Sequence, residues 1–213
     1  MISKNIIDLK KKIGTDVKII AVSKKKPKSS ILECFHSGQI DFGENRVQEL
    51  CEKANSLPDE INWHMIGKLQ RNKVKYIVSF IHLIHSVDSI KLLKEIDKQA
   101  KKINRIINVL IQVHIANEKT KSGFSYNEAE ILLSKKNDLK NIDIIGLMGM
   151  STFTSDKKII SNEFKKLNEF YIKWKSRHNF SILSMGMSND YMLAIENGSN
   201  LIRIGTLIFG SRI

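Results

Sequence analysis

The sequence alternates eight times between a short run rich in β-branched residues and a longer amphipathic segment rich in lysine. Runs that are apolar on consecutive positions, such as Asn108-Val-Leu-Ile-Gln-Val113, are typical of parallel strands buried on both faces. Eight β–α units in one chain predict an α/β fold, a single (β/α)8 or TIM barrel. The expected strands are Val17–Val22, Ile40–Phe42, Trp63–Ile66, Ile81–Ser86, Ile106–Val113, Ile142–Leu147, Phe180–Leu183 and Leu201–Ile204.

The segments between these strands are predicted to be helical, and an extra N-terminal helix precedes the first strand. Each unit has about 27 residues, which is lean beside the roughly 250 residues of a typical barrel and requires short loops. An open doubly wound sheet is the alternative, but it needs a glycine-rich turn where this sequence reads Ser23-Lys-Lys-Lys-Pro27. With no linker, composition break or repeat, residues 1–213 are expected to form one domain. The expected helices are Ile2–Lys12, Lys28–Ser37, Val47–Asn55, Asn72–Ser79, Ser89–Lys102, Asn127–Lys135, Lys157–Arg177 and Asn189–Asn197.

Composition restricts the partners and the compartment. A net charge of +13 would fit a nucleic-acid-binding protein, but the lysines are spread along the chain without any nucleic-acid-binding motif, which favours solvated helix faces. The longest uncharged stretches are about a dozen residues, short of the roughly 18 that a membrane helix needs. The first residues do not form a signal peptide, and Cys34 and Cys51 are too few for a disulfide framework. We therefore expect a cytoplasmic protein that binds neither nucleic acid nor membrane.

In a (β/α)8 barrel, chemistry is performed at the carboxyl ends of the strands. Lys24 follows the first expected strand, and strand alternation directs either Ser23 or Lys24 inward. An amine enclosed by apolar walls loses its proton more readily and becomes nucleophilic, as a Schiff-base lysine must be. The alternative is an ordinary surface lysine in the run from Lys24 to Lys28.

The last two units carry a second signal. Ser188 follows the seventh expected strand, where Ser188 or Asn189 is the expected N-cap of the next helix, and Gly205-Thr206 follows the eighth. These are the two loops with which barrels commonly bind phosphate, through backbone N–H groups and hydroxyls. Each element alone also fits a turn glycine or a capping residue. A lysine after strand one combined with a phosphate site after strands seven and eight describes a pyridoxal 5′-phosphate (PLP) site.

The motifs around these positions resemble those of the pyridoxal phosphate homeostasis protein family. The similarity runs in the expected order from about Val17 to Arg212, nearly the whole chain. The motifs that carry it are Ala21-Val-Ser-Lys24-Lys-Lys-Pro27, Phe42-Gly-Glu-Asn45-Arg-Val-Gln-Glu49, Trp63-His-Met-Ile-Gly-Lys-Leu-Gln-Arg-Asn-Lys73, Lys121-Ser-Gly123, Gly146-Leu-Met148, Leu183-Ser-Met-Gly-Met-Ser188-Asn-Asp190 and Ile202-Arg-Ile-Gly-Thr-Leu-Ile-Phe-Gly-Ser-Arg212.

This resemblance implies a barrel like the N-terminal domain of alanine racemase that holds PLP as an internal aldimine on Lys24. It also implies that Arg203 faces the pyridine nitrogen and that Asn45 lies beside the ring. The phosphate-binding residues that it implies are Ser188, Gly205 and Thr206.

The remaining polar and sulfur-containing residues have less specific signals. Met187, one of several methionines near strand ends, is included among the cofactor-binding residues because methionines there are expected to pack around an aromatic ring. His64 fits either a hydrogen-bonded core histidine or a site residue. We predict no metal site, because His82, His85 and His114 have no cysteine or carboxylate at metal-ligand spacing.

An arginine at the pyridine nitrogen predicts a carrier more than a catalyst. Guanidinium only donates hydrogen bonds, so it leaves the pyridine unprotonated and the cofactor a weak electron sink. Racemases with such an arginine add a second acid/base from another domain, and the sequence stops at Ile213, so we expect none. We therefore predict a monomeric, non-enzymatic protein of intracellular vitamin B6 homeostasis, which buffers PLP or delivers it to apo-enzymes. The alternatives are a low-activity PLP-dependent amino-acid racemase and a basic nucleic-acid-binding protein.

Overall fold

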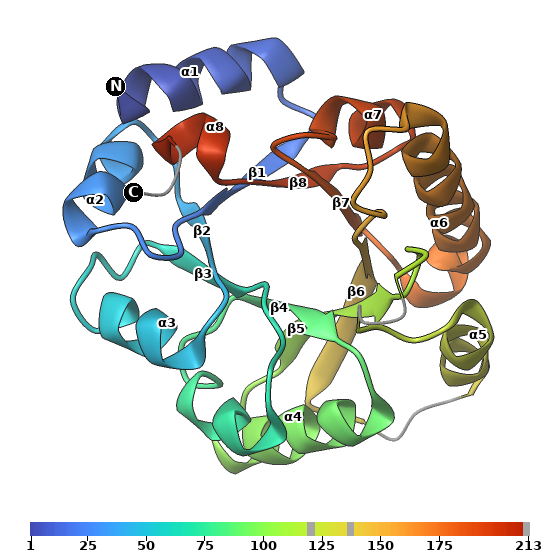
Figure 1. The fold of residues 1–213 in the computed structure, drawn as a ribbon. Coiled ribbons are helices and arrows are strands. Elements are labelled where there is room, and N and C mark those ends of the chain that lie inside the picture. The colour runs from blue at the N-terminus through green and yellow to red at the C-terminus, as the bar shows by residue number, and fades with distance from the viewer. Residues whose placement is uncertain (119–121, 136–138, 211–213) are drawn as a thin grey trace.

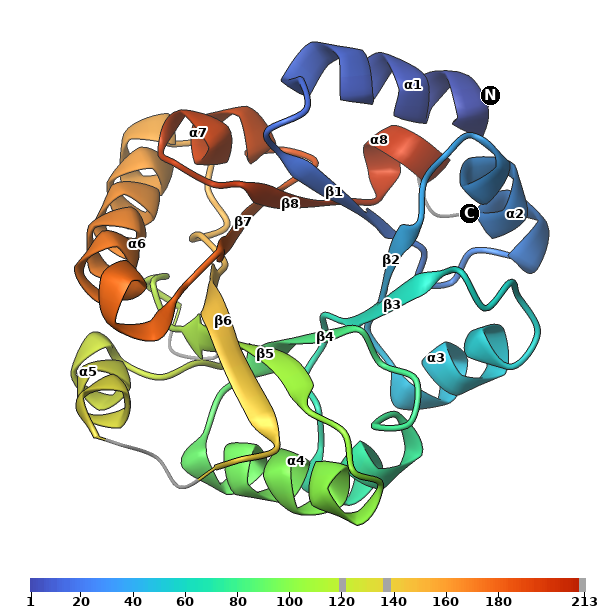
Figure 2. The same cartoon turned by 180° about the vertical axis from the view of Figure 1, so that it is seen from behind.

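Eight parallel strands form a closed barrel in the order of the sequence, and helices surround it (Figures 1 and 2). The computed structural model describes residues 1–118, 122–135 and 139–210, so Lys121 and Arg212 of the sequence motifs lie outside the described residues. The barrel closes because the first strand pairs with the last, with Lys18 in register with Leu201. The predicted (β/α)8 barrel is confirmed. The strands are β1 (Lys18–Val22), β2 (Asp41–Glu44), β3 (Asn62–Met65), β4 (Leu83–Val87), β5 (Ile107–Val113), β6 (Ile142–Gly149), β7 (Ile182–Met187) and β8 (Leu201–Ile204).

The helices follow the predicted order, with two differences. The segment after β3 is a short 3₁₀ helix instead of an α-helix, and a four-residue helix that the sequence analysis did not predict follows β8. The extra N-terminal helix is present and packs beside α2 and α8. Within the described residues, no helix is both long and apolar enough to cross a membrane. The helices are α1 (Ile2–Ile13), α2 (Lys28–His36), α3 (Val47–Ala54), η1 (Arg71–Tyr76), α4 (Ile90–Lys102), α5 (Tyr126–Ser134), α6 (Lys157–His178), α7 (Tyr191–Glu196) and α8 (Thr206–Phe209).

Two layers of apolar side chains fill the molecule. The larger layer lies between the strands and the helices and includes Ile19 and Ala21 of β1. A separate small cluster contains Leu83, Leu110 and Met148. Leu83 shares its strand face with a histidine of β4 that reaches β7 across the barrel, so this small cluster is the barrel interior.

The interior is narrow where β1, β2 and β3 meet. A Cβ atom on Gly43 would lie 2.8 Å from Ile20 Cγ2 and 3.0 Å from Ile66 Cδ1. Because Gly43 has no Cβ atom, the side chains of Ile20 and Ile66 can fill the barrel interior at this position.

The largest difference from the predicted strands is at β7. The sequence pattern predicts a strand over Phe180–Leu183, whereas the observed strand is Ile182–Met187. Ser184 and Gly186 made the second half of this segment resemble a loop. In the folded chain Ser184 faces the barrel interior, where its hydroxyl is hydrogen-bonded to His85 and Arg203. Ser188 consequently follows the strand directly.

Candidate functional site

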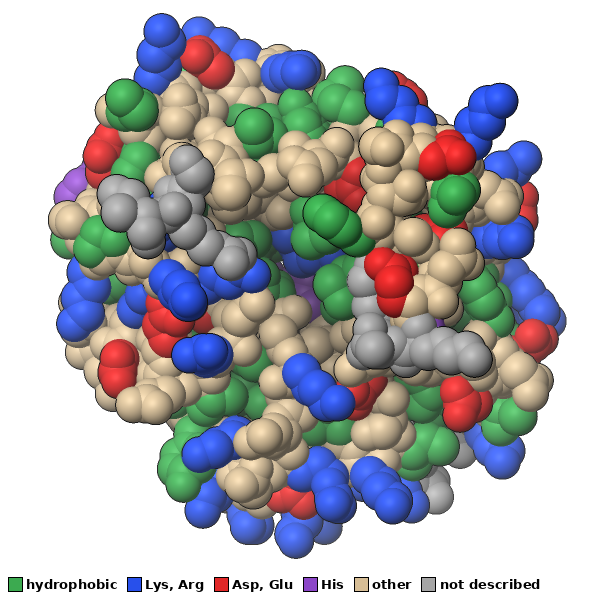
Figure 3. All heavy atoms as spheres, viewed as in Figure 1, with side chains coloured by type: hydrophobic (Ala, Val, Ile, Leu, Met, Phe, Trp, Pro, Cys, Tyr) green, Lys and Arg blue, Asp and Glu red, His purple; other side chains and the backbone are tan. Residues whose placement is uncertain are grey.

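Lys24 follows β1 by two residues, at the carboxyl end of the strand. Because Ile19 and Ala21 face the outer core, strand alternation directs Ile20 and Val22 inward, and Lys24 lies in the turn that follows. Lys24 is half-buried. The space-filling view of the face seen in Figure 1 shows a hollow at its centre, with basic and histidine side chains at its floor (Figure 3).

A tight turn fixes the backbone after Lys24. Lys26 N–H donates to Ser23 O at 3.0 Å, and Lys25 adopts a left-handed conformation with φ 59°. The Lys25 N–H donates to Glu49 Oε1 at 2.5 Å, which ties the turn to α3. Lys26 extends to the end of α8, where its ammonium donates to Phe209 O at 3.1 Å. The neighbouring lysine is therefore directed away from the hollow.

A buried charged network lies directly behind this turn. Lys53 of α3 donates to Glu44 Oε1 at 2.8 Å, Glu49 Oε1 at 2.7 Å and Ser23 O at 2.8 Å. Ser23 Oγ donates to the same Glu44 oxygen at 2.6 Å. Burial raises the pKa of Glu44, although the hydrogen bonds from Lys53 and Ser23 act to lower it. The network joins β1, β2 and α3, and so positions the turn that carries Lys24.

Asn45 follows β2 beside this turn and is half-buried. The loop after β3 approaches its backbone so closely that a Cβ on Gly67 would lie 2.3 Å from Asn45 O. Ser86 of β4 holds the same loop by donating to Gly67 O at 2.6 Å. Gly67 is therefore required for the placement of Asn45 at the mouth of the barrel.

The loops after β7 and β8 meet beside the end of β1, where a Cβ atom on Gly205 would lie 3.4 Å from Val22 O. Gly205 N–H donates to Ser188 Oγ at 3.3 Å, which joins the two loops. Gly205 is the N-cap of α8, and Thr206 begins the helix. The first N–H groups of a helix have no acceptor within it, so this short helix adds donors to the same region. Met187 is 40% exposed at the end of β7.

The N-cap of α7 is Asp190, not Ser188 or Asn189 as predicted. Asp190 Oδ1 accepts from Met187 N–H at 2.6 Å, and Asp190 N–H donates to Met187 O at 3.1 Å. Because of this turn, α7 begins at Tyr191 instead of at the predicted Asn189. It also leaves the Ser188 hydroxyl at the Gly205 amide instead of at the helix.

Arg203 is buried inside the barrel on β8. Its guanidinium donates to Ser184 O at 3.0 Å, Ser184 Oγ at 2.6 Å and Gly149 O at 3.1 Å. Burial lowers its pKa to about 10, with the charge of Asp190 acting to raise it. Among the described residues, no carboxylate forms a salt bridge with it. A buried guanidinium without an anionic partner favours a ligand that supplies an acceptor.

A chain of hydrogen bonds continues from Arg203 through the barrel. Ser184 Oγ lies 3.2 Å from His85 Nδ1, and His85 Nε2 lies 3.0 Å from His64 Nδ1. His64 Nε2 lies 3.0 Å from Asp41 Oδ1. Because a guanidinium only donates and a carboxylate only accepts, a fully bonded chain of neutral rings must donate from Arg203 towards Asp41. This places the ring proton on Nε2 of both histidines.

The electrostatics agree with a neutral His85 ring. Burial lowers the pKa of His85 well below its ordinary value, and the neighbouring His64 and Arg203 act in the same direction. Burial would raise the pKa of Asp41, but hydrogen bonds from His64 and Asn62 prevail and lower it. The sequence alone left His64 open between a core residue and a site residue, and it held no signal for Ser184. The spacing of these residues in the sequence did not indicate that they form a chain of hydrogen bonds.

Comparison with known proteins places this barrel in a class. The family model "Alanine racemase, N-terminal domain" matches residues 1–213. Alanine racemase of Clostridium difficile has the same fold, with a TM-score of 0.78 over 99% of this chain and 56% of the racemase, at 17% identity. The fold is thus that of the alanine racemase N-terminal barrel.

Within this class, the chain belongs to the pyridoxal phosphate homeostasis protein family. The family member of Aquifex aeolicus is 39% identical over 198 residues, which cover 92% of this chain and 87% of the relative. The Helicobacter pylori member is 41% identical over 196 residues, covering 91% and 87%. PipY of Synechococcus elongatus, solved with PLP bound, superposes with a TM-score of 0.89 at 32% identity over 99% of this chain and 100% of PipY.

Proposed function

We propose that this protein binds pyridoxal 5′-phosphate at the carboxyl end of the barrel and buffers it or delivers it to other proteins. The names of its relatives and the PLP in the PipY structure support this proposal. When bound, the cofactor supplies a reactive aldehyde and an electron-withdrawing ring. The protein's contribution is to hold both in one place and limit what they react with.

The side chains around the hollow fit such a ligand. Lys24 provides an amine for covalent attachment of the aldehyde carbon. Ser188 and Thr206 provide hydroxyl donors for the phosphate, and Gly205 lets the backbone approach it, with its amide 3.3 Å from Ser188 Oγ. Asn45 and Met187 would flank the ring.

Arg203 is the observation that carries the proposal. Its described hydrogen bonds use at most three of the five guanidinium N–H groups, and none of the acceptors is charged. A pyridine nitrogen is an uncharged acceptor that would satisfy a remaining donor. The same arginine cannot deliver a proton readily to that nitrogen, which keeps the ring a weak electron sink.

This arrangement supports a carrier without catalytic activity over a low-activity racemase. Racemisation needs an acid/base on the face of the ring opposite the lysine. The four tyrosines, which are the usual candidates, are all in helices of the outer layer and none directly follows a strand. They are Tyr76, Tyr126, Tyr171 and Tyr191.

We further propose that the protein is a single-domain monomer in the cytoplasm and that apo PLP-dependent enzymes receive its cofactor. The two cysteines support a reducing compartment, because Cys34 and Cys51 are both free thiols. Burial raises the pKa of Cys34 to about 12, so this thiol stays protonated and inert.

The test combines spectroscopy with peptide mapping. The purified full chain is incubated with PLP, its near-visible absorbance is recorded, and borohydride is added before proteolysis and mass spectrometry. We expect one stable adduct, on the peptide containing Lys24. An adduct spread over many surface lysines, or none, would contradict the proposal. Incubation with D- and L-amino acids in the same preparation tests the racemase alternative, and robust turnover would favour it.

A further inference from the structure

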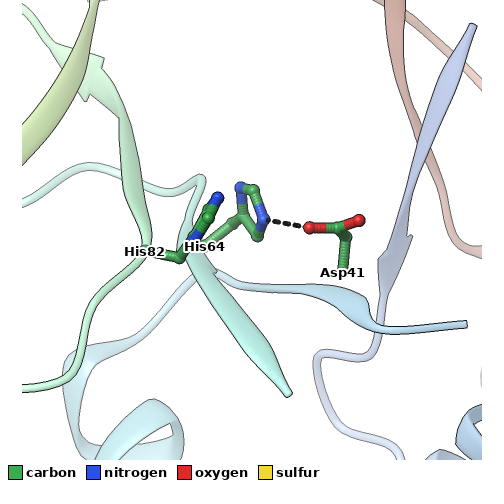
Figure 4. A group of neighbouring side chains, drawn as sticks. All are labelled: Asp41, His64 and His82. Atoms are coloured by element: carbon green, nitrogen blue, oxygen red, sulfur yellow. Dashed lines mark hydrogen bonds and ion pairs between the residues drawn. The ribbon is translucent and has the colours of Figure 1, made fainter. Parts of the chain in front are cut away.

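Three side chains with metal-binding atoms meet at the amino end of the barrel, opposite the hollow. Asp41 is the first residue of β2, His64 is in β3, and His82 directly precedes β4 (Figure 4). One ligand atom from each lies within 4.8 Å of the others. Neighbouring parallel strands begin side by side, so the fold brings together residues that are about 20 positions apart in sequence.

The spacing of these atoms suits one small ion. Atoms within 4.8 Å of one another can all lie within about 2.8 Å of a common point, and zinc bonds to nitrogen and oxygen are about 2.0–2.2 Å. Shifts of less than about 1 Å per side chain would therefore complete the coordination. His82 is exposed and Asp41 is partly exposed, so both can move and solvent can reach them.

His64, the buried member, is already oriented. Its Nε2 is directed at Asp41 Oδ1 at 3.0 Å, while its Nδ1 contacts His85 Nε2 at 3.0 Å. A histidine that binds a metal through one nitrogen normally has the other nitrogen hydrogen-bonded to a fixed partner, which sets the ring orientation. His85 is that partner, and it is in turn anchored to Ser184 Oγ at 3.2 Å.

We propose that Asp41, His64 and His82 form a binding site for a divalent transition-metal ion of the zinc class. Two imidazole nitrogens and one carboxylate oxygen select such ions over Mg²⁺ or Ca²⁺, which prefer oxygen ligands. Three protein ligands leave a fourth position for water or an exogenous ligand. Lys18 and Arg105 lie near His82, and their charges act against a cation there.

Metal binding would reverse the hydrogen-bond chain inside the barrel. An ion on His64 Nε2 requires the ring proton on Nδ1, which then donates to His85 Nε2. His85 must in turn carry its proton on Nδ1 and donate to Ser184 Oγ. Each ring keeps one proton on the opposite nitrogen, and the two lone pairs of Ser184 Oγ accept from both His85 and Arg203. Metal binding at the amino end would thereby change the hydrogen bonding of Ser184, which is the partner of Arg203.

The binding experiment uses the full chain without an affinity tag, after treatment with a chelator. Calorimetric titration with ZnCl₂ should show one saturable site, and titration with MgCl₂ should show none. His82→Ala and Asp41→Asn should each weaken Zn²⁺ binding about a hundredfold. His36→Ala, which removes an exposed histidine elsewhere, is the matched control and should bind as the parent does.

The proposal is overturned if the parent shows no saturable Zn²⁺ site, or if His82→Ala binds Zn²⁺ as tightly as His36→Ala does. A second measurement tests the role of His64 without replacing this buried residue. Nitrogen NMR of the imidazoles should show the His85 proton on Nε2 without metal and on Nδ1 with Zn²⁺. An unchanged His85 tautomer in the Zn²⁺-bound protein would place the ion away from His64 and would also overturn the proposal.

Discussion

The two ends of the barrel are built from opposite chemistry on the same strands. Towards the hollow, the carboxyl end presents an amine, a guanidinium, hydroxyls and backbone amides, all of which donate hydrogen bonds, while the carboxylates of Glu44 and Glu49 behind them are bonded to Lys53. The amino end presents a carboxylate and imidazoles, which accept hydrogen bonds or bind cations. The first set suits a phosphorylated ligand and the second suits a metal ion. A barrel can therefore carry two unlike sites when its inward positions differ in polarity from one end to the other.

The chain from Arg203 to Asp41 explains how these ends coexist. TIM-barrel interiors are ordinarily filled by layers of branched apolar side chains. Here Ser184, His85 and His64 replace part of those layers with a continuous path of hydrogen bonds. Every buried polar group on the path has a partner, so the polar interior costs little stability.

The largest expected effect is at the carboxyl end. Lys24→Ala should abolish the borohydride-stable PLP adduct, because it removes the amine that follows β1 at the carboxyl end of the barrel, and should leave Zn²⁺ binding unchanged. Mass spectrometry after reduction measures the adduct. Lys26→Ala is the matched control, since the Lys26 ammonium is held at Phe209 O and Gly210 O. An adduct that survives Lys24→Ala but not Lys26→Ala would move the attachment point.

The next effect concerns the charged network that supports only this end. Lys53→Met should lower the free energy of unfolding by about 3–5 kcal/mol, because it leaves the Glu44 carboxylate buried without its cation. Denaturant unfolding measures this loss. Glu44→Gln in the same chain should restore most of the stability, since the unpaired charge is removed. A loss below about 1 kcal/mol for Lys53→Met would mean that the network is not structurally important.

Phosphate contacts should have a smaller but distinct effect. A hydrogen bond to a charged group contributes roughly 1.5–3 kcal/mol, so Ser188→Ala or Thr206→Ala should weaken PLP binding about ten- to a hundredfold. Fluorescence or absorbance titration gives the Kd. Ser134→Ala, at an exposed position on α5, serves as the control. Parent-like affinity in both variants would place the phosphate elsewhere, and pyridoxal without phosphate should bind poorly to the parent.

The smallest effect is expected for Met187. Its side chain is 40% exposed and contributes only apolar contact, so Met187→Ala should weaken PLP binding by about fivefold, equivalent to about 1 kcal/mol. The same titration measures it. A loss as large as that of Ser188→Ala would show that Met187 does more than pack against the ring.

Most of the architecture was predictable because it depends on local patterns. The alternation of apolar runs with amphipathic segments determined the eight units, and the β8 bounds agree with the prediction at both ends. Predictions were wrong where tertiary contacts override local preference. β7 continues through Ser184 because that hydroxyl has partners inside the barrel, and α7 begins later because Asp190 caps the preceding turn.

The same distinction between local patterns and tertiary contacts applies to the candidate sites. By itself, the sequence determined the barrel and the motifs around Lys24, Ser188 and Gly205, since each is a short segment at a recognisable strand end. Only the tertiary structure decided the path through the interior and the cluster at the amino end. His85 and Ser184 are 99 residues apart and meet because the barrel closes. Such contacts depend on which strands face one another across the barrel, and that relation has no counterpart in residue spacing.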